Sequence, residues 1–206
     1  MALREPPLGV NIGNNSGFTT LSWVEWFSEL FANGTTGRPL LESITVSDSP
    51  TSVEVTQEIN ATKLRYEILL SNIKVSSNGA NIQLLASTDG GTTYLEDYDF
   101  FTYKVQSSTS LSTSSGTGEG VVGLESSGLS SSEFKECNGT ITIEQPADTE
   151  THKQVYWDLY YFDTVGNKTI ERGYGTINTI SALNAFKIQI SNGVLKSGTV
   201  AFYGIK

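Results

Sequence analysis

The chain has 206 residues, a net charge of −9 and one cysteine, Cys137. This length suffices for one sizeable domain with a short appendage. Lysine and arginine do not cluster anywhere, so the sequence lacks the cationic surface that DNA and RNA binding requires, and we expect no nucleic-acid partner. A single cysteine excludes an intrachain disulfide and a cysteine-based zinc site.

Residues 1–21 have no hydrophobic periodicity and contain Pro6-Pro7 and "GNNSG", so we expect an extended arm. The first ten residues lack the apolar segment of a secretory signal. No apolar stretch in the sequence is long enough to span a bilayer. We therefore expect neither a membrane anchor nor export by a signal peptide.

A short amphipathic helix is predicted over residues 22–32. Ser22 and Glu25 form a capping box at its start, and Asn33-Gly34 provides a stop signal at its end. Five large apolar residues recur with helical spacing on one face: Trp23, Trp26, Phe27, Leu30 and Phe31. A helix this short is marginal in water, so it must dock on the protein's own core or on another protein.

After the connector "NGTTGRP", short alternating apolar runs separated by turn signals predict an all-β domain over residues 40–206. We count about eight strands, the number in a jelly-roll β-sandwich with antiparallel strands. Asn78-Gly79, Gly166-Asn167 and Asn192-Gly193 separate successive runs and suit tight hairpin turns. Residues 107–132 are rich in serine, threonine and glycine, and we expect a long low-complexity surface loop there.

The segment "VYWDLYYF" carries the most aromatic residues of any predicted strand. Alternation places Trp157, between Val155 and Leu159, on the core face. The opposite face carries Tyr156, Tyr160 and Phe162 and should be exposed. An exposed aromatic row indicates a contact surface, either a subunit interface or a platform on which sugars stack.

Catalytic chemistry has little support in the sequence. The only histidine, His152, lies in a polar segment, and no nucleophile or metal motif accompanies it. Three acidic residues, Glu96, Asp97 and Asp99, surround Tyr98 and could hydrolyse a glycoside or bind calcium. Solvated turn charges explain them better, so we expect no catalytic, metal or cofactor site and no enzyme. A polysaccharide depolymerase is the remote alternative.

Three segments, taken in order, resemble a β-sandwich domain common in virion proteins of tailed bacteriophages. They are "LSNIKVSSNGANIQLLASTDGGTTYLEDYDF", "NGTITIEQPADTETHKQVYWDLYYFDTVGN" and "INTISALNAFKIQISNGVLKSGTVAFYGIK". The front segment "PPLGVNIGNNSGFTTLSWVEWFSELF" is similar to the arm and Trp/Phe helix with which phage fibres and spikes enter a particle. The resemblance implies that residues 1–36 are a virion anchor and that the helix stripe contacts other virion proteins.

The resemblance also implies a function and a location. We expect a structural protein of the phage particle, made in the host cytoplasm and mounted on capsid, portal or tail as a homotrimer. A short tail fibre, a head fibre, a collar protein and a decoration protein all fit. The alternative is a module on the same scaffold that binds a host-surface glycan.

Overall fold

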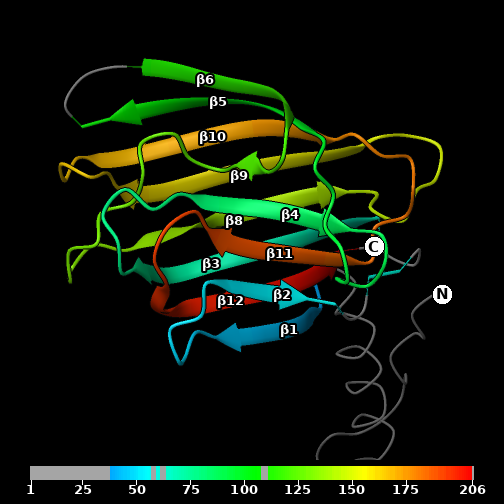
Figure 1. Cartoon of the computed structure of the whole chain (residues 1–206), viewed down its shortest axis with the longest axis horizontal. Helices are drawn as coiled ribbons and strands as arrows, with labels where there is room; N and C mark the ends of the chain where they lie inside the picture. Colours follow the sequence, from blue (N-terminus) through cyan, green and yellow to red (C-terminus); the bar gives the residue numbers. More distant parts are fainter. Residues whose placement is uncertain (1–37, 57–58, 61–63, 108–110, 206) are drawn as a thin grey trace, which may run out of the picture. The chain divides into compact units, whose positions relative to one another are not determined.

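The computed structural model describes residues 38–56, 59–60, 64–107 and 111–205 (Figure 1). These residues belong almost entirely to one compact unit, Leu40–Lys206. The described part is all-β, as the alternating runs predicted, and its twelve strands form two antiparallel sheets. No helix long and apolar enough to cross a membrane occurs in the part of the chain that the structure describes.

The larger sheet has eight strands in the order β1-β12-β3-β8-β9-β10-β5-β6, and the smaller has four in the order β2-β11-β4-β7. In Figure 1 the smaller sheet lies in front of the larger one. The bounds in the larger sheet are β1 Leu40–Thr45, β12 Leu195–Ile205, β3 Arg65–Val75, β8 Cys137–Glu144, β9 Lys153–Phe162, β10 Lys168–Ile177, β5 Tyr98–Gln106 and β6 Leu111–Glu119. Those in the smaller sheet are β2 Ser52–Val55, β11 Ala185–Ile190, β4 Ile82–Ser87 and β7 Val122–Gly123.

The core lies between the two sheets and is built from alternate residues of the strands. In β3, for example, Tyr66, Ile68 and Leu70 are at most 1% exposed. Rings from opposite sheets meet in this layer, where the centroids of Phe186 and Phe202 are 6.1 Å apart. A polar contact also joins the sheets, because the amide of Ala86 donates to the hydroxyl of Tyr98 at 2.9 Å. The arrangement is a two-layer sandwich.

Trp157 lies in the core, as its alternation predicted, and is 4% exposed. Its partner across the β9–β10 ladder is Gly173. A Cβ atom on Gly173 would stand 2.0 Å from the indole ring, so only glycine leaves room for the tryptophan. The wide ring of Trp157 thus fills space on the inner face of two strands.

The expected number of about eight strands is too low. The additional strands are β1, β5, β6 and β7. β1, β6 and β7 lack a clean apolar alternation, whereas in β5 the alternating apolar residues Phe101, Tyr103 and Val105 are exposed. In β6, "LSTSSGTGE", the only large apolar side chain is that of Leu111, and it is exposed. This strand is held by its backbone ladder with β5, which would otherwise be the sheet edge.

The long loop expected over residues 107–132 is likewise not what the structure has. After β6 and β7, residues 124–130 form a strap in which Leu124 and Leu129 are buried. The amide of Ser126 in this strap donates to the buried Glu171 of β10, and Leu129 forms a β-bridge with Asp163, so the strap lies against the larger sheet. The strap is also fixed by a buried carboxylate, since Glu125 accepts hydrogen bonds from the amides of Ile82 and Gly128. Two leucines and one glutamate thus hold this serine-rich segment in place.

A second buried carboxylate, Glu171 of β10, lies beneath the strap. It accepts hydrogen bonds from the hydroxyls of Thr102 (2.7 Å) and Tyr161 (2.6 Å) and from the amide of Ser126 (3.1 Å).

The carboxylate of the strap, Glu125, has a shifted pKa. Because burial costs a charged carboxylate its hydration, the pKa of Glu125 is raised to about 7, although its backbone donors oppose the shift.

Only one of the three predicted hairpin turns joins paired neighbours. Gly166-Asn167 connects β9 to β10, which are adjacent in the larger sheet. Asn78-Gly79 and Asn192-Gly193 instead carry the chain from one sheet to the other, between β3 and β4 and between β11 and β12. The turn signals were correct as breaks in the chain, but they do not tell a hairpin from a sheet crossing.

The crossing from β4 to β5 is the "STDGGTT" turn. Asp89 accepts hydrogen bonds from the amide and hydroxyl of Thr93 and from the hydroxyl of Ser87. These bonds lower the pKa of Asp89 to about 2, the hydroxyl of Thr93 contributing most. Gly90 and Gly91 have φ values of 75° and 87°, which glycine adopts without strain.

The predicted helix over 22–32 lies outside the described residues. The same is true of the five residues of its apolar stripe, Trp23, Trp26, Phe27, Leu30 and Phe31.

Candidate functional site

The face of the larger sheet that points away from the smaller sheet, here called the outer face, is rich in exposed aromatic residues. On β9 the structure exposes Tyr156 (41%) and Tyr160 (46%), as the alternation predicted. Phe162, the third member of the predicted row, is only partly exposed and has the ammonium of Lys135 5.7 Å from its ring centroid. The neighbouring strands β10 and β5 add further exposed aromatic residues: Tyr174 (41%), Phe101 (48%) and Tyr103 (41%).

Strand register arranges the outer face in rows that run across the strands. One row joins Tyr156 to Tyr174 and Tyr174 to Phe101, and the rings of the two tyrosines are 5.3 Å apart. The next row joins Asp158 to Arg172 and Arg172 to Tyr103. A third row joins Tyr160, Ile170 and Val105. Aromatic, charged and aliphatic side chains therefore follow one another along the strands.

A hollow of about 490 Å³ crosses the first two rows. We call it the aromatic hollow, and it is lined by Phe101, Tyr103, Thr140, Thr142, Tyr156, Trp157, Asp158, Arg172, Gly173 and Tyr174. Its volume is within the range of small-ligand sites in proteins. A second hollow of about 510 Å³ lies beside it over the aliphatic row, with Val105, Tyr160 and Ile170 among its lining residues.

The centre of the aromatic hollow is charged. The guanidinium of Arg172 lies 3.0 Å from Oδ2 of Asp158, and the same oxygen accepts a hydrogen bond from the hydroxyl of Tyr160 at 3.2 Å. The pKa of this guanidinium is raised above its ordinary value, mainly by the hydrogen bond to Asp158 and then by those to Tyr160 and Tyr103. The other carboxylate oxygen, Oδ1 of Asp158, is buried and has no hydrogen-bond partner among the described residues.

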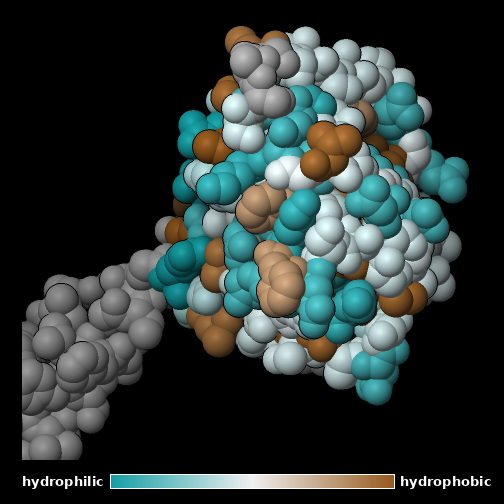
Figure 2. Space-filling model, turned by 90° about the vertical axis from the view of Figure 1, so that its left-hand side faces the viewer, coloured by the Kyte–Doolittle hydropathy of each residue, from teal (hydrophilic) through white to brown (hydrophobic). Residues whose placement is uncertain are grey.

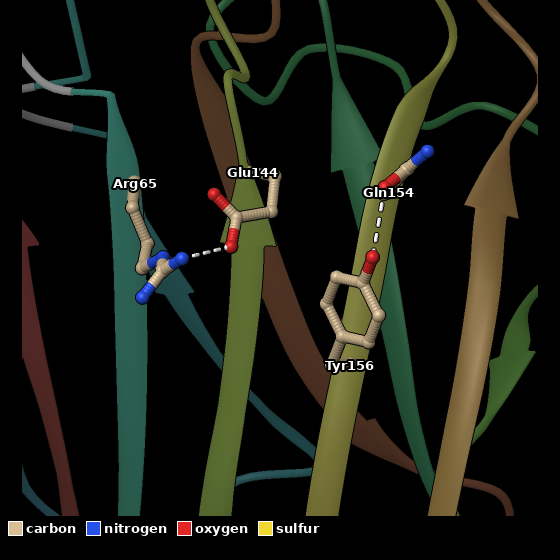
Figure 3. Close-up of polar contacts among 4 residues, drawn as sticks. All are labelled: Arg65, Glu144, Gln154 and Tyr156. Carbon is tan, nitrogen blue, oxygen red and sulfur yellow. Dashed lines mark hydrogen bonds and ion pairs between the residues drawn. The ribbon is translucent and has the colours of Figure 1, made fainter.

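The ring of Tyr156 at the hollow is held by its own hydroxyl group. The hydroxyl of Tyr156 donates to Oε1 of Gln154 at 2.8 Å, so the ring lies along β9 (Figure 3). Beside the ring of Tyr156, Arg65 of β3 and Glu144 of β8 form an ion pair of 2.6 Å, which adds a polar pair to the outer face (Figure 3). A ring fixed in this way loses little conformational entropy when a ligand stacks on it.

The end of the sandwich at the β9–β10 turn is a weaker candidate. Exposed apolar residues at this end include Val165 (81%). Figure 2 looks onto this end and shows apolar residues standing singly among hydrophilic and neutral ones. Scattered apolar residues are normal on protein surfaces, so this end is not a contiguous apolar patch.

The three acidic residues around Tyr98 are not gathered into a site. Asp97 accepts a hydrogen bond from the amide group of Asn178 at 2.8 Å, and Asp99 accepts one from the backbone of Gly118 at 2.9 Å. Glu96 is exposed. Among the described residues no group of three acidic, histidine or cysteine side chains is placed to hold a metal ion.

The other two reactive residue types lie apart from the hollow. His152 is exposed just before β9. Cys137 is 1% exposed, and burial raises the pKa of its thiol, which makes it a packed side chain and a poor nucleophile.

Sequence reasoning missed most of the hollow. It found the row on β9 but not Phe101, Tyr103, Arg172 or Tyr174, which come from β5 and β10. The alternation in "FFTYKV" is a signal for the first two, because Phe101, Tyr103 and Val105 share one face. Nothing in the sequence indicated that β5 and β9 would be joined through β10.

The chain matches no known protein-family model, and no curated protein and no solved structure is significantly similar to it.

Proposed function

We propose that this chain is a structural component of a bacteriophage particle. In this proposal, residues 1–36 attach it to capsid, portal or tail, and the β-sandwich projects as part of a short fibre, spike, collar or decoration protein. The short helix over 22–32 makes the contact through Trp23, Trp26, Phe27, Leu30 and Phe31. The complete particle would carry the protein as a homotrimer.

The observation that supports this proposal most is the position of the three phage-like segments in the fold. The first runs through β3 and β4, the second through β8 and β9, and the third through β11 and β12. These six strands include the middle of both sheets. The resemblance therefore concerns the strands that form the core of the sandwich. We include a jelly-roll topology in the same proposal because the chain crosses repeatedly between the two sheets.

Removal of residues 1–36 tests the anchor. The truncated protein and the full chain are each mixed with phage particles that lack the wild-type protein, and co-sedimentation is measured beside a thermal melt. The proposal predicts that the truncated protein melts cooperatively but no longer sediments with particles. Normal co-sedimentation of the truncated protein would overturn it.

Glycan binding on the outer face is the second candidate function. The observation that favours it is the aromatic hollow, in which exposed aromatic rings, among them the hydrogen-bonded Tyr156, lie beside a polar centre. Sugars present both apolar C–H faces and hydroxyl groups, so a site of this composition fits them.

A further inference from the structure

We propose that the aromatic hollow binds a neutral oligosaccharide, with tyrosine rings stacked on sugar faces and Asp158 accepting a sugar hydroxyl. The inference deepens the second candidate function and rests on it. It does not depend on where the protein is mounted.

The first argument is the composition of the hollow. Tyr156, Tyr174 and Phe101 form one row of adjacent rings, and each is more than 40% exposed. Facing this row, the side chains of Thr140, Asp158 and Arg172 are polar. An extended sugar chain lying along the row would set its apolar faces on the rings and its hydroxyl groups toward these polar side chains.

The second argument is the carboxylate of Asp158, whose side chain is 29% exposed. Oδ2 accepts from Tyr160 and pairs with Arg172, whereas the buried Oδ1 has no partner among the described residues. Because Oδ1 is buried, a ligand hydroxyl can reach only Oδ2, where it would replace the hydrogen bond from Tyr160 at 3.2 Å. The hollow thus offers a sugar hydroxyl one charged acceptor beside the row of rings.

The third argument concerns charge. The cation at the centre, Arg172, is already neutralised by Asp158 at 3.0 Å. The nearby Arg65 is likewise paired with Glu144, and the whole chain carries a net charge of −9. An anionic polysaccharide would find no unpaired cation in these two pairs and would be repelled by the net charge, so the geometry favours an uncharged sugar.

The same features argue against a second copy of the chain as the occupant. Interface cores are depleted of charged residues, yet the hollow has an ion pair at its centre. A second copy docked through the same hollow would place its own Asp158–Arg172 pair there, and both carboxylates would lose their contact with water.

The adjoining aliphatic row, with Val105 and Ile170, extends the platform for a longer sugar chain.

The test measures binding of the full chain to a panel of neutral hexasaccharides of glucose, galactose, mannose, rhamnose and N-acetylglucosamine by titration calorimetry. Hyaluronan fragments of matched length are the anionic comparison. We expect at least one neutral member to bind with a millimolar or tighter dissociation constant and the anionic fragments not to bind. Failure of all neutral members, or binding of the anionic fragments alone, would overturn the inference.

Variants identify the surface that binds. Tyr174→Ala should weaken binding roughly tenfold, as expected for a central aromatic contact, and Asp158→Asn should weaken it measurably. The matched control is Phe134→Ala, because Phe134 is 90% exposed but lines neither hollow. Equal loss in the control would contradict the assignment.

Sedimentation velocity of the same variants separates the glycan from a second copy. Tyr174→Ala should leave the oligomeric state unchanged. If it converts an oligomer to monomers, the outer face is a subunit contact and the glycan inference falls. The attachment to particles is measured separately by co-sedimentation, so failure of one proposal does not imply failure of the other.

Discussion

Trp157 fits inside the sandwich only because the residue opposite it on β10 has no side chain. We expect Gly173→Ala to destabilise the protein by roughly 1–3 kcal/mol, since its Cβ would overlap the indole ring at 2.0 Å. Trp157→Ala should cost roughly 3–5 kcal/mol through the cavity that it leaves. Urea unfolding of both variants measures these free energies.

The double variant gives the decisive control for this pair. With the indole ring removed, the methyl group that Gly173→Ala introduces occupies empty space, so the combined cost should be smaller than the sum of the single costs. Strict additivity would mean that Gly173 is needed for a reason other than the ring.

Glu125 makes stability depend on pH. Its pKa is raised to about 7 from an ordinary value of 4.5, so between these values the folded state binds more protons than the unfolded state. Stability should therefore be highest below pH 4.5 on this account, fall as the pH rises to 7 and then level off, a change of about 3 kcal/mol. Lys104 and Glu171 also act on this carboxyl, the first lowering and the second raising its pKa.

Glu125→Gln tests this assignment because the amide does not titrate. Urea unfolding from pH 4.5 to 8 should show a smaller fall in stability for the variant than for the wild type. The variant should also be less stable at low pH, because its amide group cannot reproduce all the bonds to Ile82 and Gly128. An unchanged slope would assign the pH dependence to other groups.

At the scale of elements, residues 107–132 contain two parts that contribute differently to the stability of the fold. Leu124→Ala, in the strap, should cost roughly 2–5 kcal/mol because this side chain is fully buried. Leu111→Ala, in β6, should change stability by about 0.5 kcal/mol or less because this side chain is 68% exposed. Thermal melts of the two variants compare them directly, and similar effects would show that the strap is not docked as described.

The same segment shows where reading the sequence reaches its limit. Alternation identified β9 and its two faces because most of its residues are large and either aliphatic or aromatic. In β6 the order comes from a backbone ladder that any sequence can make, so serine and threonine gave no periodic signal. The strap at 124–130 is held by two leucines and a glutamate, a pattern too sparse to distinguish from a loop.

The candidate site shows the same limit in another form. Tyr156 and Tyr160 could be predicted because their exposure depends on one strand alone. Asp158 and Arg172 meet across the predicted β9–β10 hairpin, but Phe101 and Tyr103 join them only because β10 also pairs with β5, which a single sequence does not state. The long-range pairing of β5 with β10 thus completes a hollow whose other strands follow one another in the chain.

At the scale of the whole molecule, the anchor hypothesis separates particle binding from folding. Trp26→Ala with Phe27→Ala should abolish co-sedimentation with particles and barely change the melting temperature of the free protein. Large apolar side chains are each worth roughly 1.5–3 kcal/mol when buried, so two of them suffice to decide where the segment docks. A collapse of the free protein in the melt would show that these side chains belong to its own core.

The most direct measurement of the central claim is a cryo-EM map of the phage particle that encodes this chain, compared with a map of particles lacking it. The account predicts additional density that fits the sandwich of residues 40–206 outside the particle, with residues 1–36 in contact with a capsid, portal or tail protein. Identical maps, or density attached through the outer face of the sandwich with the N-terminal segment free, would contradict it.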